Sequence, residues 1–587
     1  MVMRMSADPA VDERAPEQPE SDEEPAAEAS AEAPDDAPVL EASDSAESSD
    51  SAESSDSAES SDGLEASEAA DEPRGTRLDS WWAGLLSTPR RRALWYWGGP
   101  LLVTLIAAVL RFWNLGHANT LIFDETYYVK DAWTLWIHGY ETRWPDDYDG
   151  TWNAGDPMGF LPDPSYVVHP PLGKWVIGLG MAVFGTLDPF WWRATTALVG
   201  TIAVFLVAVI ARRLTHSTVI GVFAGLLFAV DGNAIAMSRI ALLDNHVMFF
   251  ALLGFWFILL DRDRTARILR ELLEAARAKG VEPMYGPAIW QRPWVYAAGA
   301  AFGATAAVKW SGIYFVAAFG IYLVLVDLLS RRREGVKFWA TGAILKQAPV
   351  TFVQLVPTAF VVYLAAWSGW IFTDGGYDRH YADGEGMAWT GPFAWVPTWF
   401  QSLLAYHQAA YQFHLGVASP HPWQANPLTW LLMIRPTNMY YHEVPGCDGV
   451  CTESIIGIGN PLVWWAASAA GLYLVYRLAR YREWQIGLVL TGLAAGYLPW
   501  LAYRNRTVFQ FYSIAFEPYL ILILALVAAL ILGKPTDPTW RRQRGIAMLA
   551  VYTVAVVAVS IFFYSIVAAL PIPATLRQLH FWLPSWG

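Results

Sequence analysis

Residues 94–113 read LWYWGGPLLVTLIAAVLRFW and closely follow the basic stretch Arg90–Arg92. About 20 predominantly apolar residues are enough for an α-helix to cross a bilayer. Because basic flanks stay on the cytoplasmic side, we expect the N-terminus inside and the next loop, residues 114–190, outside. The chain of 587 residues is 54% hydrophobic and has a mean hydropathy of +0.27, which is typical of a polytopic membrane protein.

The negative net charge of −14 belongs to the first 80 residues. They hold 25 of the 54 acidic residues but only 4 of the 40 basic ones, so the remainder is mildly basic. The hexad Ser-Asp-Ser-Ala-Glu-Ser repeats from Ser43 through Ser60. A segment so charged and so poor in large apolar residues cannot bury a core, and residues 1–80 are predicted to be a disordered cytoplasmic tail.

The topology depends on residues 175–185, which are apolar but too short for a span of about 20 residues. If they crossed, four later basic clusters would lie outside, against the positive-inside rule. We therefore expect a juxtamembrane helix there and about eleven transmembrane helices in an all-α bundle, with the C-terminus outside. The predicted spans are 94–113, 190–211, 217–231, 243–260, 293–308, 311–329, 348–372, 461–479, 485–502, 515–533 and 545–570.

Two long segments outside the spans have distinct compositions. Residues 373–460 form a large exported loop. Residues 262–292 form a cytoplasmic segment, and within it 267–277 have the apolar spacing of an amphipathic helix. We expect that helix to lie on the inner leaflet.

The first exported loop contains an adjacent acidic pair, Asp124-Glu125. Neighbouring residues on a helix point about 100° apart, so one carboxylate can face a pocket while the other anchors the turn. A carboxylate within hydrogen-bond reach of a hydroxyl can act as a general base. The alternative is a pair of acids that stabilises a helix N-terminus.

Four further blocks place charged residues beside the membrane: His169–Lys174, Ser238–Asp244, Val308–Gly312 and Arg504–Arg506. Ionisable groups next to a bilayer are costly and indicate function by default. Basic side chains there suit a phosphate, which Arg binds with its forked donors. For the first and third blocks, the alternative is a lysine that simply reaches the lipid headgroups. For the second block it is an ion pair between its own Arg and Asp, and for the fourth it is a patch that binds lipid headgroups.

The loop 373–460 contributes two more predictions. His421 and Trp423 are candidates for an acceptor groove, with loop packing as the alternative. Cys447 and Cys451 are the two cysteines of the chain, and in an exported loop they are predicted to form a disulfide. Two cysteines without a set of His partners make a poor zinc site.

Several motifs are absent from the sequence. It contains no phosphate-binding glycine loop or dinucleotide fingerprint. The cytoplasmic segments are also too short for a nucleotide-binding domain. These absences favour a phosphorylated substrate presented from the membrane on the outer side, and no nucleic-acid partner is expected.

Taken together, the blocks resemble the protein O-mannosyltransferases of the GT-C class, and the bacterial, actinobacterial type in particular. The resemblance covers about residues 94–570 and implies a glycosyltransferase domain over 94–587. The blocks that carry it occur in order: Phe123–Glu125, His169–Lys174, Ser238–Asp244, Val308–Gly312, His421–Trp423 with Pro427 and Trp430, and Arg506–Phe509.

The resemblance implies inverting transfer of mannose from a polyprenyl-phosphate carrier to Ser or Thr of exported proteins. Asp124 is then the general base, and Glu125 holds the loop or the sugar. Positive groups would stabilise the leaving phosphate. The residues expected on the donor side are His169, Lys174, Arg193, Arg239, Asp244, Lys309, Arg504 and Arg506.

The same resemblance sets the expected partners and location. The partners are the lipid donor, translocating acceptor proteins and, as a candidate, the secretion translocon. The location is the plasma membrane, with the active site on the extracytoplasmic side. No cofactor is required by these residues, and a divalent cation at Asp124, Glu125 and Asp244 is left open.

Three rival functions fit parts of the pattern. A related GT-C enzyme could transfer another lipid-linked sugar to a lipid or an envelope glycan. A secondary transporter would show inverted repeats, and none is visible between the halves of this sequence. A structural scaffold anchored through the acidic tail would not need Asp124.

Overall fold

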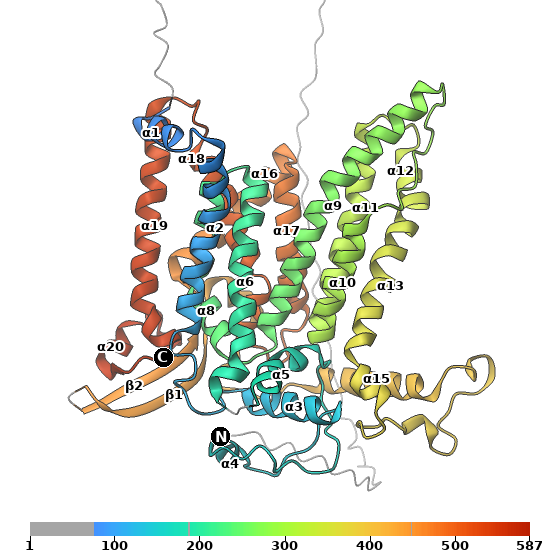
Figure 1. Cartoon of the computed structure of the whole chain (residues 1–587), viewed down its shortest axis with the longest axis vertical. Coiled ribbons are helices and arrows are strands. Elements are labelled where there is room, and N and C mark those ends of the chain that lie inside the picture. Colours follow the sequence, from blue (N-terminus) through green and yellow to red (C-terminus); the bar gives the residue numbers. More distant parts are fainter. Residues whose placement is uncertain (1–74, 186–187, 448) are drawn as a thin grey trace, which may run out of the picture. The chain divides into compact units, whose positions relative to one another are not determined.

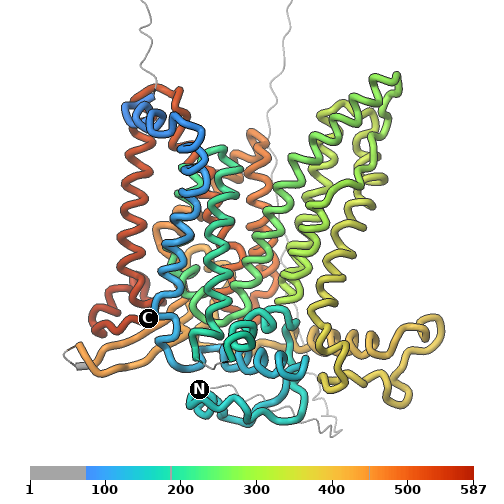
Figure 2. The backbone as a smooth tube through the Cα atoms, viewed as in Figure 1, coloured from blue at the N-terminus to red at the C-terminus, as the bar shows by residue number. Residues whose placement is uncertain are grey.

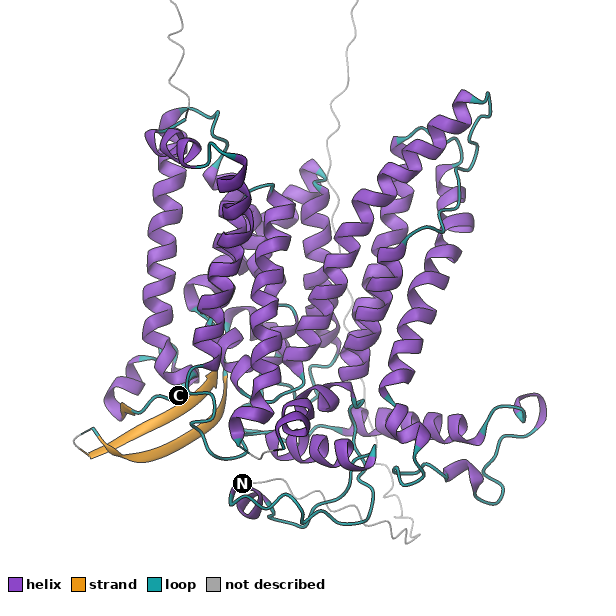
Figure 3. Ribbon diagram, viewed as in Figure 1, coloured by secondary structure: helices purple, strands orange, loops and turns teal. Residues whose placement is uncertain are grey.

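The computed structural model describes residues 75–185, 188–447 and 449–587 and is mostly helical, as Figure 3 shows. Most of the predicted tail therefore lies outside the described residues. Its predicted boundary at residue 80 is too late, because α1 (Arg77–Leu85) begins inside that range. Thr76 and Asp79 cap this helix reciprocally, and Asp79 also pairs with Arg542 at 2.7 Å.

Each of the eleven predicted spans coincides with a helix (Figure 1). The helices are α2 (Pro89–Phe112), α6 (Pro189–Thr215), α7 (Thr218–Val230), α9 (Asp244–Ala278), α10 (Pro293–Val308), α11 (Ile313–Arg333), α13 (Ala348–Ala366), α16 (Pro461–Tyr481), α17 (Trp484–Tyr497), α18 (Glu517–Leu532) and α19 (Thr539–Val567).

The expected count of eleven spans is not confirmed by helix length. Among the described residues, eight helices are long and apolar enough to cross a membrane. A ninth arises if α7 and α8 (Gly232–Arg239), which meet at a bend of 58°, form one broken span. The helices α10 and α18 have 16 residues each and fall short of this length.

The interior of the bundle is built around α18 and α6. Eleven of the sixteen residues of α18 are buried, because a helix that is apolar on every side must be surrounded by other helices. Small residues allow close helix contacts: a Cβ at Gly221 of α7 would lie 2.6 Å from the Ala208 carbonyl of α6. Close approach of this kind is what joins helices inside a bilayer.

The segment after the α9 span differs from its prediction. Helix α9 continues without a break to Ala278, so the expected separate helix on the inner leaflet is wrong. Its apolar face is used within the protein, because Leu269 and Leu273 pack with Ile289 and Val336. The amphipathic pattern was correctly recognised, but its apolar side covers a neighbouring loop instead of lipid.

The loops predicted to be exported gather at one end of the helices (Figures 1 and 2). Helix α5 is the predicted juxtamembrane helix; it has 13 residues and packs against α3. The short helices outside the spans are α3 (Glu125–His138), α4 (Asp149–Asn153), α5 (Leu172–Phe184), α12 (Trp339–Thr341), α14 (Ser368–Phe372), α15 (Thr398–Gly416) and α20 (Ala574–Leu579).

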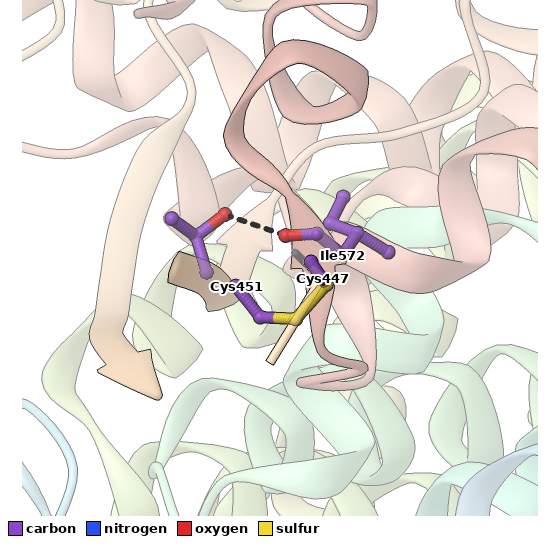
Figure 4. Close-up of a disulfide and its surroundings, with 4 residues drawn as sticks. Cys447, Cys451 and Ile572 are labelled. Carbon is purple, nitrogen blue, oxygen red and sulfur yellow. Dashed lines mark hydrogen bonds between the residues drawn. A yellow bond between two sulfur atoms is a disulfide. The ribbon is translucent and has the colours of Figure 1, made fainter. Parts of the chain in front are cut away.

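The all-α prediction missed a small antiparallel sheet in the order β1 (Thr437–Gly446), β2 (Gly449–Gly457) and β3 (Ile572–Pro573). The predicted disulfide between Cys447 and Cys451 is present at the tip of the β1–β2 hairpin. Figure 4 shows it next to Ile572, whose carbonyl accepts a hydrogen bond from the Thr452 hydroxyl at 3.4 Å.

Candidate active site

Asp124 lies at the entrance to α3, directly after a residue with an unusual backbone conformation. Phe123 has a φ of +51°, in the left-handed region that bulky side chains rarely adopt. Its ring is held edge-on by His421, Phe509 and Phe511, at centroid distances of 6.3, 5.9 and 5.7 Å. Backbone strain that surrounding packing maintains is concentrated at functional sites, and here it lies directly before Asp124.

The environment of Asp124 suits a general base. Burial raises the pKa of this carboxyl to about 6, while the nearby Lys309 ammonium acts in the opposite direction. The neighbouring Tyr128 side chain also acts to lower this pKa, and the Asp244 carboxylate acts to raise it. A base is most effective when its pKa lies near the working pH.

Glu125 has a different role, which is to hold the loop in place. Its two carboxylate oxygens accept hydrogen bonds from the Arg193 guanidinium at 2.8 and 2.7 Å, and the pair is buried. They also accept the backbone N–H groups of Ile122 and Ala241. The remaining Arg193 donors reach carbonyls of residues 115–120. This pair therefore ties the first exported loop to α6 and leaves Arg193 no free donor direction.

Lys309 and Asp244 form a second buried pair. The Lys309 Nζ lies 3.0 and 3.1 Å from the two Asp244 oxygens. It also stands 3.9 Å from the centre of the Tyr512 ring. The lysine at the end of α10 thus has the carboxylate partner that its position requires, and the pair sits beside Asp124.

A cavity of about 620 Å³ opens next to this pair. Helices α10, α11 and α13 contribute apolar walls, including Val316, Val356 and Phe360. The exported segments contribute polar groups, whose members are His169, Lys309, His407, His414 and Arg506. A cavity with span-derived apolar walls and cationic groups at the exported loops suits a lipid whose headgroup is anionic.

Arg506 is held in place by His414. The guanidinium donates to the Nδ1 of His414 at 3.0 Å, and the Nε2 of that ring lies 3.2 Å from the Val168 carbonyl. Burial, with Arg506 adding to it, lowers the pKa of His414 to about 4, so the ring is neutral. Within the described part of the chain, the Nε of Arg506 and the Nδ1 of His169 have no hydrogen-bond partner.

The other predicted donor-side residues lie elsewhere. Lys174 pairs with Glu141 and, at 3.6 Å, with Asp131. Arg239 donates to backbone carbonyls, among them that of Trp113 at 2.8 Å. Arg504 is exposed on the turn before Arg506. The basic residues that line the cavity are therefore Lys309 and Arg506.

On the predicted acceptor side, His421 contacts Phe123 and Phe509, whereas Trp423 lies under the Arg435 guanidinium at 5.6 Å. Tyr128 and His414 were missed as site residues from the sequence. Tyr128 lies four residues after Asp124. Nothing in the sequence linked residue 414 to residue 506.

The described residues contain no group of three or more His, Cys, Asp or Glu side chains arranged to hold a metal ion. Of the three carboxylates considered for a cation, Glu125 binds Arg193 and Asp244 binds Lys309.

Fold and site together define a multi-pass membrane glycosyltransferase of the GT-C class. Two family models match the chain. One describes the C-terminal four-transmembrane region of protein O-mannosyltransferases and covers residues 399–586. The other describes dolichyl-phosphate-mannose–protein mannosyltransferases and covers residues 168–272.

Curated relatives agree with these models. The chain is 34% identical over 497 residues to the polyprenol-phosphate-mannose–protein mannosyltransferase of Mycobacterium tuberculosis, with 83% of this chain and 91% of the relative covered. It is 35% identical over 507 residues to the enzyme of the same name from Mycolicibacterium smegmatis, with coverages of 84% and 93%. The chain belongs to the protein mannosyltransferase family.

A solved structure supports the fold. The Saccharomyces cerevisiae protein O-mannosyltransferase Pmt1–Pmt2 complex, bound to the sugar donor, aligns with a TM-score of 0.63 and 14% identity. The alignment covers 88% of this chain and 95% of that chain.

Proposed function

We propose that this enzyme transfers mannose from polyprenyl-phosphate-mannose to Ser or Thr hydroxyls of exported proteins. The observation that supports this reaction is the lipid-sized cavity whose cationic end, Lys309 and Arg506, adjoins Asp124. The polyprenyl chain occupies the apolar part of the cavity and the phosphate meets the two cations.

In the reaction, Asp124 accepts the proton of the acceptor hydroxyl while its oxygen attacks the anomeric carbon from the side opposite the phosphate. The bond from that carbon to the phosphate oxygen breaks, and the electron pair leaves with the phosphate. The configuration inverts. Arg506 and Lys309 stabilise the charge on the leaving phosphate, and stabilisation of this kind is worth about 3 kcal/mol for one donor.

The supporting residues have distinct roles in this proposal. Glu125 and Arg193 position the loop that carries Asp124. The neutral His169 ring, whose pKa burial lowers well below its ordinary value, offers a hydrogen-bond donor to the phosphate or sugar. His421, near Phe123, lies where an acceptor segment would approach.

The proposed location is the plasma membrane, with the site on the extracytoplasmic side. The Arg-rich starts of α2 and α19 and the end of α9 lie opposite the end that holds α3, α5 and α15 (Figure 1). Basic ends of this kind face the cytoplasm. Acceptors would then meet the enzyme as they leave the secretion translocon, which we include as a candidate partner.

The test uses proteoliposomes, a radiolabelled polyprenyl-phosphate-mannose donor and a Ser/Thr-rich peptide. Wild-type protein is expected to label the peptide, and the folded Asp124→Asn variant is expected not to. Label that appears on lipid instead of peptide would favour the related transferase that modifies a lipid. Peptide labelling that survives Asp124→Asn would remove Asp124 from the mechanism.

A further inference from the structure

We propose that α15 and the loop before it, residues 386–416, form a lipid-binding surface embedded in the interface of the exported leaflet. This surface goes beyond the proposed reaction, and the lipid contact does not depend on mannosyl transfer. We call these residues the interfacial arm.

The first observation is a long stretch of sequence without charged residues. From Gly386 through Ile434 the chain contains no Asp, Glu, Lys or Arg, although this stretch belongs to a loop outside the spans. The preceding residues 373–385 hold four acids and one arginine. Charged side chains are costly at membrane depth but cost nothing in water, so their exclusion over such a length indicates contact with lipid.

The second observation is the exposure of large apolar side chains on the arm. Phe393 and Trp395 are 61% and 77% exposed, and Met387 and Trp389 are exposed as well. On α15 Leu404 is exposed as well, whereas the exposed Tyr411 and Leu415 line the cavity described above. Several large apolar side chains exposed together on one short segment mark a contact with a membrane or a partner.

The loop holds its aromatic side chains in a defined arrangement. The Gln401 carboxamide accepts the Trp389 N–H and donates to the Val396 carbonyl, both at 2.7 Å. The Trp389 and Phe393 rings are 6.5 Å apart. Because the turn is fixed from its inner side, its apolar side chains are held outward.

The opposite face of α15 is already occupied by the protein. Tyr406 donates to the Val167 carbonyl at 2.6 Å, and His407 bonds the Tyr363 hydroxyl of α13 at 2.6 Å. This face also carries His414, which holds Arg506 at the cavity. Only the outer face of the arm is left to bind anything else.

The occupant we assign is lipid instead of a second protein. Helix α15 packs against α13 at the end of the spans where the exported loops gather (Figure 1), which is the level of a membrane boundary. Trp and Tyr are the residues that are enriched at the headgroup boundary, and the arm exposes Trp389 and Trp395. A protein interface has a polar, charged rim around its centre, and the arm has no charged residues to supply one.

The test measures depth in the bilayer by site-directed spin labelling. The two native cysteines form the Cys447–Cys451 disulfide, so one introduced cysteine is the single reactive thiol. Labels are placed by Phe393→Cys, Trp395→Cys and, on α15 itself, Leu404→Cys. The full chain is reconstituted in nanodiscs of phosphatidylglycerol and phosphatidylethanolamine, and collisions with oxygen and with a water-soluble nickel chelate are compared.

Two matched controls set the scale. Ile321→Cys lies on an exposed position of α11 and reports the lipid phase, while Tyr441→Cys lies on an exposed position of β1 and reports water. We expect oxygen collisions to exceed nickel collisions several-fold at 393, 395 and 404, as at 321, with the reverse at 441.

Two results would overturn the proposal. Labels at the three arm positions that behave like the label at 441 would place the arm in water. Labels shielded from both reagents would mean that a protein surface, such as a second copy of the chain, covers the arm. Neither result bears on mannosyl transfer, so failure of this proposal and failure of the proposed function are distinguishable.

Discussion

At the residue scale, the protonation state of Asp124 is expected to set the pH dependence of the reaction. Because burial raises the pKa of its carboxyl to about 6, the group is ionised above that pH and protonated below it. Only the ionised form can accept a proton, so kcat/KM is expected to fall as the pH is lowered through about 6. Initial rates with saturating peptide and varied donor would test this. A profile that stays flat through this pH would contradict the assignment of Asp124 as base.

The neighbouring carboxylate should behave differently. Glu125→Ala leaves the buried Arg193 guanidinium without its partner, and breaking a buried pair in this way costs about 3–5 kcal/mol. We expect a large loss of thermal stability in detergent, with activity lost as a consequence. Asp124→Asn is the matched control and is expected to lose activity while its melting temperature changes little. Equal stability of the two variants would remove the anchoring role of Glu125.

His414 is expected to act through Arg506. In His414→Leu the arginine loses a hydrogen-bond acceptor, and bonds to charged groups are worth about 1.5–3 kcal/mol. The expected result is an increase of about 10- to 100-fold in KM for the lipid donor, with a smaller change in kcat. His414→Gln keeps both a donor and an acceptor and should restore much of the affinity. A merely structural role would lower the amount of folded protein instead and would leave KM unchanged.

At the element scale, the β1–β2 hairpin shows how a short disulfide acts locally. Cys447 and Cys451 are four positions apart, and closing so small a loop stabilises by about 2 kcal/mol on the chain-entropy estimate. In a Cys447→Ser/Cys451→Ser variant we expect faster amide exchange confined to the hairpin tip. Mannosyl transfer is expected to continue, because the candidate catalytic residues lie on other elements. Faster exchange throughout the bundle would contradict this local role.

At the scale of the whole molecule, a buried charge cluster joins the ends of the helices opposite the active site. Arg292, before α10, lies 2.6 Å from Asp261 of α9 and 2.8 Å from Asp327 of α11. Arg292→Met leaves the buried Asp261 without its arginine partner, whereas Asp327 keeps Arg331 at 3.9 Å. The unpaired Asp261 is expected to cost about 3–5 kcal/mol of stability. Thermal denaturation followed by size-exclusion chromatography would measure the loss.

A compensated variant provides the control for that cluster. Combining Arg292→Met with Asp261→Asn removes the unpaired charge, so part of the lost stability should return. If the double variant were no more stable than Arg292→Met alone, the loss would come from packing and not from charge.

Local sequence was sufficient for much of the fold. Apolar length and basic flanks placed all eleven helices, because the cost of exposing backbone or charge to lipid is set segment by segment. The same reasoning predicted the disulfide, which is confirmed. It also selected Asp124, Lys309 and Arg506 as site residues, which stay predictions. It failed for the extension of α9, since an amphipathic pattern does not say whether its apolar face meets lipid or protein.

Only the tertiary structure decided which group each basic side chain binds. Arg193, Lys174 and Arg239 had the same status in the sequence as Arg506, yet they are occupied by Glu125, by Glu141 and by backbone carbonyls. The His414–Arg506 contact joins residues 92 positions apart, which no local pattern can reveal. The sequence by itself determined which charges lie near the membrane, because desolvation is a local cost. Which of them remain available to a phosphate depends on contacts between distant segments, and only the folded chain decides those.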